Sequence, residues 1–217
     1  MSPTYRQPKT GKQHMGSRTK EDPVTQQTDK IIVSFLLDET GSMDAVRDKT
    51  ISGFNEYVAI LKTNELPTTL RLMTFNTEGF NVPYDCDDIR AVGDLTRQSY
   101  RPRAMTNLYD AIARLVQDTE GHVRHMSSRP EVICTIMTDG LENSSTEYTR
   151  KAVFNLISEK EKEGWAFIYL GANQDAWAVS ESIGIDRRNS DNYPAGAPEV
   201  ALQRSAEKTF RWLRGRL

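Results

Sequence analysis

Two short apolar segments, each ending at an aspartate, constrain the fold of this chain more than any other feature. Residues 31–37 run directly into Asp38, and residues 132–138 run directly into Asp139. Apolar runs of this length, rich in β-branched residues, are typical of strands that are buried on both faces. Strands of that kind occur in parallel sheets covered by helices, so we expect an α/β fold.

The rest of residues 30–217 alternates between helical and strand patterns. Helices are predicted at 43–62, from 108, at 145–163 behind a capping box formed by Ser144 and Glu147, before Gly184 and from 198. Further strands are predicted at 70–75, 80–84, 165–170 and 191–195, with residues 85–92 as a candidate short strand. This order predicts a doubly wound, mostly parallel six-stranded sheet with one antiparallel edge strand and helices on both faces.

Length and composition fit one domain, which we place at residues 29–217. Residues 1–28 lack apolar periodicity and contain three prolines, so we expect a disordered or loosely packed N-terminal arm. No run reaches the roughly 18 apolar residues that a membrane helix needs, and the first residues lack a secretory signal. We therefore expect no membrane contact and a cytoplasmic protein. The two cysteines have no partners at metal spacing, which argues against a zinc site.

Oxygen donors follow the two buried strands and precede one helix. Asp38, Thr40 and Ser42 alternate after the first strand, Thr106 precedes the helix that starts at 108, and Asp139 ends the second strand. Carboxylate and hydroxyl oxygens suit Mg²⁺, Mn²⁺ or Ca²⁺. The same residue types are also ordinary helix N-caps and turn residues, so the pattern alone leaves both interpretations open.

The three segments together resemble the metal-ion-dependent adhesion site (MIDAS) of von Willebrand factor type A (vWA)-like domains. Asp38-Glu39-Thr40-Gly41-Ser42 resembles the D-x-S/T-x-S motif of that family, Thr106 its lone threonine and Asp139 its later aspartate. The resemblance covers about residues 30–217. It implies that Thr40 and Ser42 coordinate Mg²⁺ directly, that Asp38 and Asp139 act mostly through water, and that Thr106 joins or leaves the ion with conformation.

The resemblance implies a metal-dependent module that binds proteins. The sequence shows no nucleophile–base pair, so we expect it to be non-catalytic, and the missing secretory signal leads us to expect an intracellular module. A cation held mainly by hydroxyl and water oxygens keeps most of its charge, so it favours a partner's Asp or Glu carboxylate as the remaining ligand. Glu39 and Asn107 are either contacts at the rim of the site or solvated loop residues. Asp110 either holds the Thr106 loop or is an ordinary charge on a helix face.

Other functions have weaker support. A Mg²⁺-dependent phosphohydrolase would need an acid/base two residues after Asp38, where Thr40 stands. No glycine-rich phosphate-binding motif follows a strand, which argues against a nucleotide site. Nucleic acid is a less favoured partner, through the basic residues of the arm, of the 90–103 segment and of the terminal helix. Self-association remains open, because an acidic side chain of the arm could reach the metal of a second copy.

Overall fold

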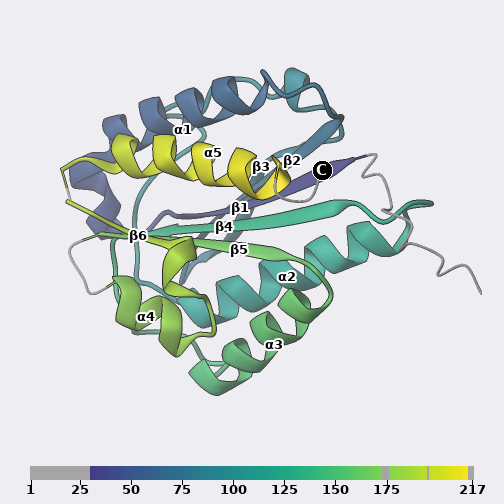
Figure 1. The fold of residues 1–217 in the computed structure, drawn as a ribbon. Coiled ribbons are helices and arrows are strands. Elements are labelled where there is room, and N and C mark those ends of the chain that lie inside the picture. Colours follow the sequence, from purple (N-terminus) through teal and green to yellow (C-terminus); the bar gives the residue numbers. More distant parts are fainter. Residues whose placement is uncertain (1–29, 173–175, 195, 215–217) are drawn as a thin grey trace, which may run out of the picture.

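The computed structural model describes residues 30–172, 176–194 and 196–214. The predicted N-terminal arm lies outside these residues, and its boundary with the domain therefore stays a prediction. Within the described residues the chain forms a three-layer arrangement, with a twisted sheet between two layers of helices (Figure 1).

The sheet has six strands in the order β3-β2-β1-β4-β5-β6. The strands are β1 (Ile31–Asp38), β2 (Thr68–Asn76), β3 (Gly79–Cys86), β4 (Glu131–Thr138), β5 (Ala166–Ala172) and β6 (Ser190–Tyr193). All neighbouring pairs are parallel except β2 with β3, which form an antiparallel hairpin. The predicted doubly wound sheet with one antiparallel edge strand is confirmed.

Within the residues that the structure describes, five α-helices cover the two faces of the sheet. They are α1 (Arg47–Leu61), α2 (Leu108–Arg124), α3 (Arg150–Lys162), α4 (Ala176–Ser182) and α5 (Pro198–Arg214). Helices α1 and α5 lie on one face, and α2, α3 and α4 lie on the other (Figure 1). Each face has its own buried apolar cluster, because alternate residues of the central strands point to opposite sides of the sheet.

Strand β1 shows how the sequence produces this sandwich. Ile31, Val33, Phe35 and Leu37 join the cluster under α1 and α5, whereas Ile32 and Leu36 join the opposite one. The ring of Phe35 meets the rings of Phe54 and Tyr57 of α1 edge-on, at centroid distances of 5.3 and 5.2 Å. A strand buried on both faces therefore accounts for the nearly continuous apolar run in the sequence.

Helices α1 and α5 pack closely at Gly53. A Cβ atom at this position would lie 2.8 Å from the Cα of Glu199 and 2.9 Å from a methyl group of Leu202. The absent side chain lets the backbones of the two helices approach each other. The terminal helix is thereby held against the same face of the sheet as the helix that follows β1.

Two predicted boundaries are wrong. Ser144 and Glu147 do not form a capping box, since α3 begins only at Arg150, with Thr149 as N-cap accepting a bond from the amide of Ala152. The intervening residues 144–148 bond to Glu142 and Asp110 instead, which keeps them out of the helix. Residues 85–92 are no separate strand: β3 extends through Cys86, and a 3₁₀ turn, η2 (Ile89–Ala91), follows.

The first helical segment also differs from its prediction in detail. A 3₁₀ helix, η1 (Gly41–Val46), precedes α1, so the residues directly after β1 are wound more tightly than an α-helix. Among the described residues, none of the helices combines the length and the apolar character required to cross a bilayer.

Candidate metal centre

The ends of β1 and β4 bring the two predicted aspartates to the same edge of the sheet. The strands are parallel neighbours, with Leu37 beside Met137. Asp38 is completely buried there, and its carboxylate is fixed at both oxygens. The amide of Thr40 donates to Oδ1 over 2.7 Å, and the hydroxyl of Thr138 donates to Oδ2 over 2.6 Å.

A chain of hydrogen bonds connects Asp38 to Asp139 through Thr40, whose amide donates to Asp38, and through Ser42. Thr40 Oγ1 lies 3.1 Å from Ser42 Oγ, which in turn donates to Asp139 Oδ1 over 2.5 Å. Thr40 is buried, whereas Ser42 is exposed and Asp139 is half-buried. Four of the five predicted side chains therefore form one cluster that opens toward solvent on the side of Ser42.

Thr106, the fifth predicted residue, joins the cluster beside Gly140. A Cβ atom placed on Gly140 would lie 3.0 Å from Thr106 Oγ1 and 3.8 Å from Asp38 Oδ2. Both oxygens therefore border the same small space, which a side chain at position 140 would fill. The loop is fixed by reciprocal bonds of 3.2 Å between Thr106 and Asn143, one of them to the Asn143 side chain.

The irregular segment before Thr106 is held in place by backbone bonds to the β1 end. The amide of Arg103 donates to the carbonyl of Glu39 over 2.9 Å, and the amide of Gly41 donates to the carbonyl of Ala104 over 3.1 Å. Ala104 has a φ of 62°, a left-handed conformation that is unusual for a residue with a Cβ atom. At this turn the chain leaves the contact between Arg103 and Glu39 and continues to Met105 and Thr106.

The electrostatics of the cluster favour a bound cation. Burial raises the pKa of Asp38 from 3.8 to about 6, and the nearby Asp139 adds to the rise, although bonds from Thr138 and Thr40 oppose it. Burial also raises the pKa of Asp139, against the bond from Ser42. Two carboxylates that are desolvated together are stabilised in their charged forms by a positive ion between them.

The oxygen donors of the cluster fit a hard divalent cation. They comprise two carboxylates and three hydroxyls: Asp38, Asp139, Thr40, Ser42 and Thr106. Within the described residues, His, Cys, Asp and Glu nowhere gather in threes as they would around an ion held by such ligands alone. Any ion at this place would therefore depend on the hydroxyls, which argues for Mg²⁺ or Mn²⁺ more than for a thiolate- or imidazole-bound metal.

Glu39 is neither a contact at the rim nor a solvated loop residue, so both sequence-based interpretations of it are wrong. Its side chain is buried and accepts bonds from Thr74 Oγ1 at 2.7 Å, from Asn81 Nδ2 at 3.4 Å and from the amide of Arg101. Glu39 therefore ties β2, β3 and the segment before Thr106 together.

Asn107 and Asp110 both lie beside the site. Asn107 is half-buried, and its Oδ1 is buried without a hydrogen-bond partner among the described residues. Asp110 accepts bonds of 2.7–3.1 Å from the backbone amides of Thr146, Glu147 and Tyr148. It therefore holds the segment after Asp139 rather than the Thr106 loop, and it is not an ordinary exposed charge.

Sequence reasoning missed two residues that position the cluster. The hydroxyl of Thr138, at the end of β4, donates to the carboxylate of Asp38, at the end of the neighbouring β1. The buried hydroxyl of Tyr100 donates to the carbonyl of Asp38 over 2.6 Å. A hydroxyl directly before Asp139 is a signal that could have revealed Thr138. Tyr100 lies 62 residues from Asp38 in an irregular segment, and no local pattern indicates its contact.

Three solved structures share this arrangement of strands and helices. The vWF domain of the type V pili tip protein Mfa5 from Porphyromonas gingivalis superposes with a TM-score of 0.60 at 11% identity, over 84% of this chain and 95% of that one. The pilus adhesin SpaC from Lactobacillus rhamnosus GG gives 0.60 at 12% identity, over 87% of this chain and 30% of that one. Proximal thread matrix protein 1 from the mussel byssus, with a zinc-occupied MIDAS motif, superposes with a TM-score of 0.59 at 14% identity. The superposition covers 82% of this chain and 47% of the mussel protein.

The chain has a vWA-like fold. Comparisons with protein-family models and with curated protein sequences found no match. At these low identities the structural similarity establishes the vWA-like fold alone. The chain spans less than a third of SpaC and about half of the mussel protein.

Proposed function

We propose that this vWA-like chain is a non-catalytic module that binds a partner protein through a divalent cation held by Asp38, Thr40, Ser42, Thr106 and Asp139. The observation that carries this proposal is the hydrogen-bonded chain from Asp38 through Thr40 and Ser42 to Asp139, with Thr106 beside it. A cation bound largely by neutral hydroxyls retains a strong attraction for an anion. An Asp or Glu carboxylate of the partner is the ligand that fits this requirement.

Exposed apolar side chains on both sides of the site support a protein partner. Met105 precedes Thr106, and Leu141 follows Asp139 by two residues. Their relative exposures of 59% and 62% are the largest among the described large hydrophobic residues. Methionine is enriched in protein interfaces, and apolar groups around a polar centre gain free energy when a partner covers them.

Metal binding can be measured without knowing the partner. We expect Mg²⁺ or Mn²⁺ to raise the thermal unfolding midpoint, with a stabilisation of about 2.7 kcal/mol at a concentration 100 times the dissociation constant. Ser42→Ala and Thr106→Ala should weaken that effect, whereas Ser128→Ala, which removes an exposed hydroxyl elsewhere, should leave it intact. Since the mussel protein has a zinc-occupied motif, Zn²⁺ belongs in the same titration.

The partner interaction needs a separate experiment. The immobilised chain should retain a protein in Mg²⁺ that is released by EDTA, and Ser42→Ala should retain less of it. Replacing single Asp or Glu residues of that protein should identify the carboxylate that contacts the ion. Retention that is equal in Mg²⁺ and EDTA would contradict a metal-dependent contact.

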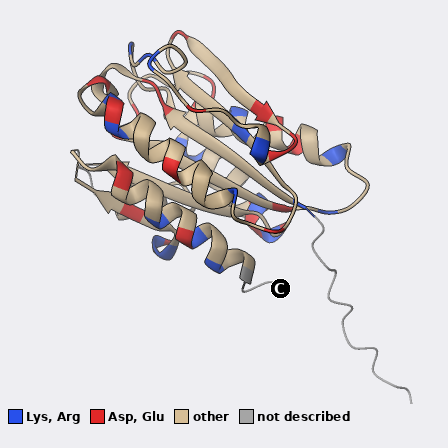
Figure 2. Ribbon diagram, turned by 90° about the horizontal axis from the view of Figure 1, so that it is seen from above, with Lys and Arg blue, Asp and Glu red and all other residues tan. Residues whose placement is uncertain are grey.

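Two alternatives make different predictions. A phosphohydrolase should turn over p-nitrophenyl phosphate in Mg²⁺ and lose this activity in Asp38→Asn. A nucleic-acid binder should show an affinity that falls steeply with salt. Among the described basic residues of these segments, Arg97 pairs with Asp48 and Lys208 pairs with Asp191. Figure 2 shows Asp and Glu interspersed with Lys and Arg along the helices that face the viewer.

A further inference from the structure

Glu39 lies within the segment that carries three of the candidate metal ligands, but its side chain contacts other parts of the chain. The side chain is buried, with 2% of the residue exposed. Its Oε1 accepts a bond from the backbone amide of Arg101. Its Oε2 accepts bonds from the hydroxyl of Thr74, in β2, over 2.7 Å and from Nδ2 of Asn81, in β3, over 3.4 Å. The two oxygens of one carboxylate therefore bind two separate parts of the chain.

The main-chain carbonyl of Glu39 makes the same connection a second time. It accepts a bond of 3.2 Å from Nδ2 of Asn76, at the end of β2, and one of 2.9 Å from the backbone amide of Arg103. Arg101 and Arg103 belong to the segment that leads to Thr106. Both acceptor groups of Glu39 therefore join the β2–β3 hairpin to the segment before Thr106.

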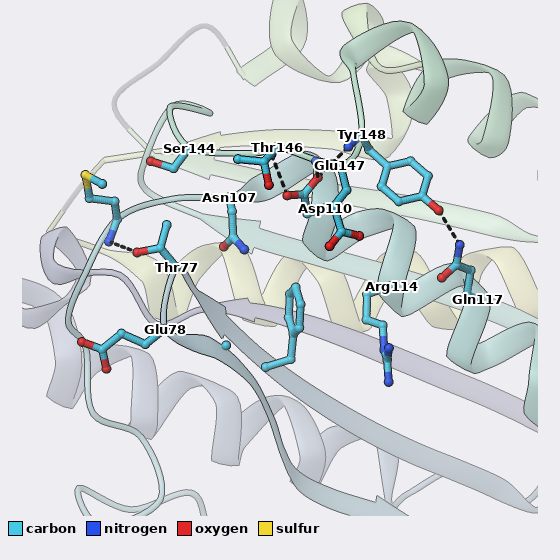
Figure 3. Close-up of a pocket in the computed structure, with 13 residues that line it drawn as sticks. Thr77, Glu78, Asn107, Asp110, Arg114, Gln117, Ser144, Thr146, Glu147 and Tyr148 are labelled. Atoms are coloured by element: carbon cyan, nitrogen blue, oxygen red, sulfur yellow. Dashed lines mark hydrogen bonds between the residues drawn. The ribbon is translucent and has the colours of Figure 1, made fainter.

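The same segment meets the hairpin again at the turn between β2 and β3. The amide of Thr77 donates to the carbonyl of Met105 over 3.0 Å, and the hydroxyl of Thr77 accepts a bond of 3.2 Å from the amide of Met105 (Figure 3). Met105 directly precedes Thr106 in the sequence. Glu39 and the hairpin together therefore hold the part of the chain from which Thr106 reaches the candidate metal centre.

A hydroxyl ligand of a divalent cation depends on its position. Thr106 Oγ1 and Asp38 Oδ2 border the small space beside Gly140, at 3.0 and 3.8 Å from a Cβ atom placed there. Mg²⁺ takes oxygen ligands at about 2.0–2.1 Å in a nearly octahedral arrangement. A neutral hydroxyl that moves away from such a distance contributes little to binding. Groups that hold a ligand in place without touching the ion therefore affect the affinity for the metal.

We propose that Glu39 is a positioning residue for the candidate metal centre. By joining residues 101–103 to the β2–β3 hairpin, it keeps the hydroxyl of Thr106 at the place where the ion binds. The hairpin, which contributes none of the five candidate ligands, is thereby coupled to metal binding. This inference rests on the proposed function, because that function assigns Thr106 to the ion.

The first test breaks the link on the hairpin side and leaves the charge of Glu39 in place, because that charge attracts a cation whatever its contacts. Thr74→Val removes the hydroxyl that donates to Oε2. We expect the dissociation constant for Mn²⁺ alone, measured by electron paramagnetic resonance of the free ion, to rise about three- to tenfold. Asn81→Ala, on an exposed residue, should act in the same direction. Thr69→Val, the same change on another buried threonine of β2, should have no effect. An unchanged affinity in both Thr74→Val and Asn81→Ala would overturn the inference.

The second test determines whether the effect passes through Thr106. In Thr106→Ala, which lacks the hydroxyl, adding Thr74→Val should change the Mn²⁺ affinity by less than about twofold, because the group that would be displaced is already absent. An equal loss of affinity with and without the Thr106 hydroxyl would indicate a general loosening of the site. That result would overturn the inference and leave the proposed function standing. A parent chain that binds no Mn²⁺ would contradict the proposed function itself, and the inference with it.

Discussion

Ser42 donates a hydrogen bond of 2.5 Å to Asp139, although 97 residues separate the two in the sequence. The bond joins the loop after β1 to the loop after β4, which are neighbouring parallel strands in the centre of the sheet. Parallel neighbours place their carboxyl ends at one edge, and in sheets of this kind ligands bind at that edge. The pairing of β1 with β4 therefore brings Asp139 next to the segment that contains Asp38, Thr40 and Ser42.

Asp38→Asn should separate the cost of the buried carboxylate from its use in metal binding. In EDTA the Asp38 charge opposes folding, because its pKa is about 6 in the folded chain and 3.8 as the unperturbed value. Well below pH 3.8 the group is protonated in both states, and stability is lost as the pH rises from there to about 6. At pH 7 the metal-free variant should therefore be more stable than the parent, by up to roughly 3 kcal/mol.

Urea unfolding of both proteins at pH 4 and pH 7, with and without Mg²⁺, measures this difference. The advantage of Asp38→Asn in EDTA should shrink toward zero at pH 4, and Mg²⁺ should stabilise the parent more than the variant. A variant that is equally stabilised by Mg²⁺ would show that Asp38 plays no part in binding the ion.

Glu39→Gln should destabilise the chain without acting on the metal directly. One carboxylate oxygen would be replaced by an amide N–H, which would face either the Arg101 amide or the donors from Thr74 and Asn81. A buried donor left unsatisfied costs about 1–3 kcal/mol, so we expect a loss of that size in urea unfolding. Glu65→Gln changes an exposed glutamate that forms no side-chain bond with the described residues, and it should alter the stability by less than about 0.5 kcal/mol. Equal stability of the two variants would argue against a stabilising role for the buried hydrogen bonds of Glu39.

Asp110→Ala should loosen the segment between β4 and α3. Its carboxylate accepts bonds from three successive backbone amides, at positions 146–148, and no shorter side chain can replace them. We expect hydrogen exchange of these three amides to become about tenfold faster or more, consistent with the loss of bonds worth about 1–3 kcal/mol. Exchange in β1 should remain unchanged, and unaltered exchange at 146–148 would contradict the assignment.

Gly53→Ala tests the close packing of α1 against α5. The added Cβ would lie 2.8 Å from backbone of Glu199, so the helices must separate, at a cost of about 1–3 kcal/mol. Gly121→Ala is the matched control, because a Cβ in that position of α2 meets nothing within 4 Å. Alanine has the higher helix propensity, so the control should gain about 0.5–1 kcal/mol. Thermal unfolding of both variants distinguishes packing from propensity.

The sequence alone predicted the sheet and the candidate site because both depend on local patterns. The apolar runs before Asp38 and Asp139 define the central strands, and parallel strands end at a common edge. The alternation of helical and strand patterns along the chain then predicted a parallel sheet between two layers of helices. The five residues of the candidate site were selected for the same reason, as polar groups directly after strands or before a helix, and their role in metal binding stays a prediction.

Local patterns could not predict contacts between residues that are distant in the sequence. The start of α3 was wrong because Asp110 and Glu142 capture the backbone of residues 144–148, and neither contact is visible from the Ser144–Glu147 spacing. Glu39 was misjudged for the same reason, since its partners come from β2, β3 and the segment before Thr106.

The sequence by itself determined which residues become buried strands and which oxygens stand at their ends, because side-chain periodicity and turn chemistry act over a few neighbours. Tertiary structure decided how those oxygens meet and that the buried carboxylate of Glu39 joins β2, β3 and the segment before Thr106. These features depend on distances between segments that only the folded sheet brings together.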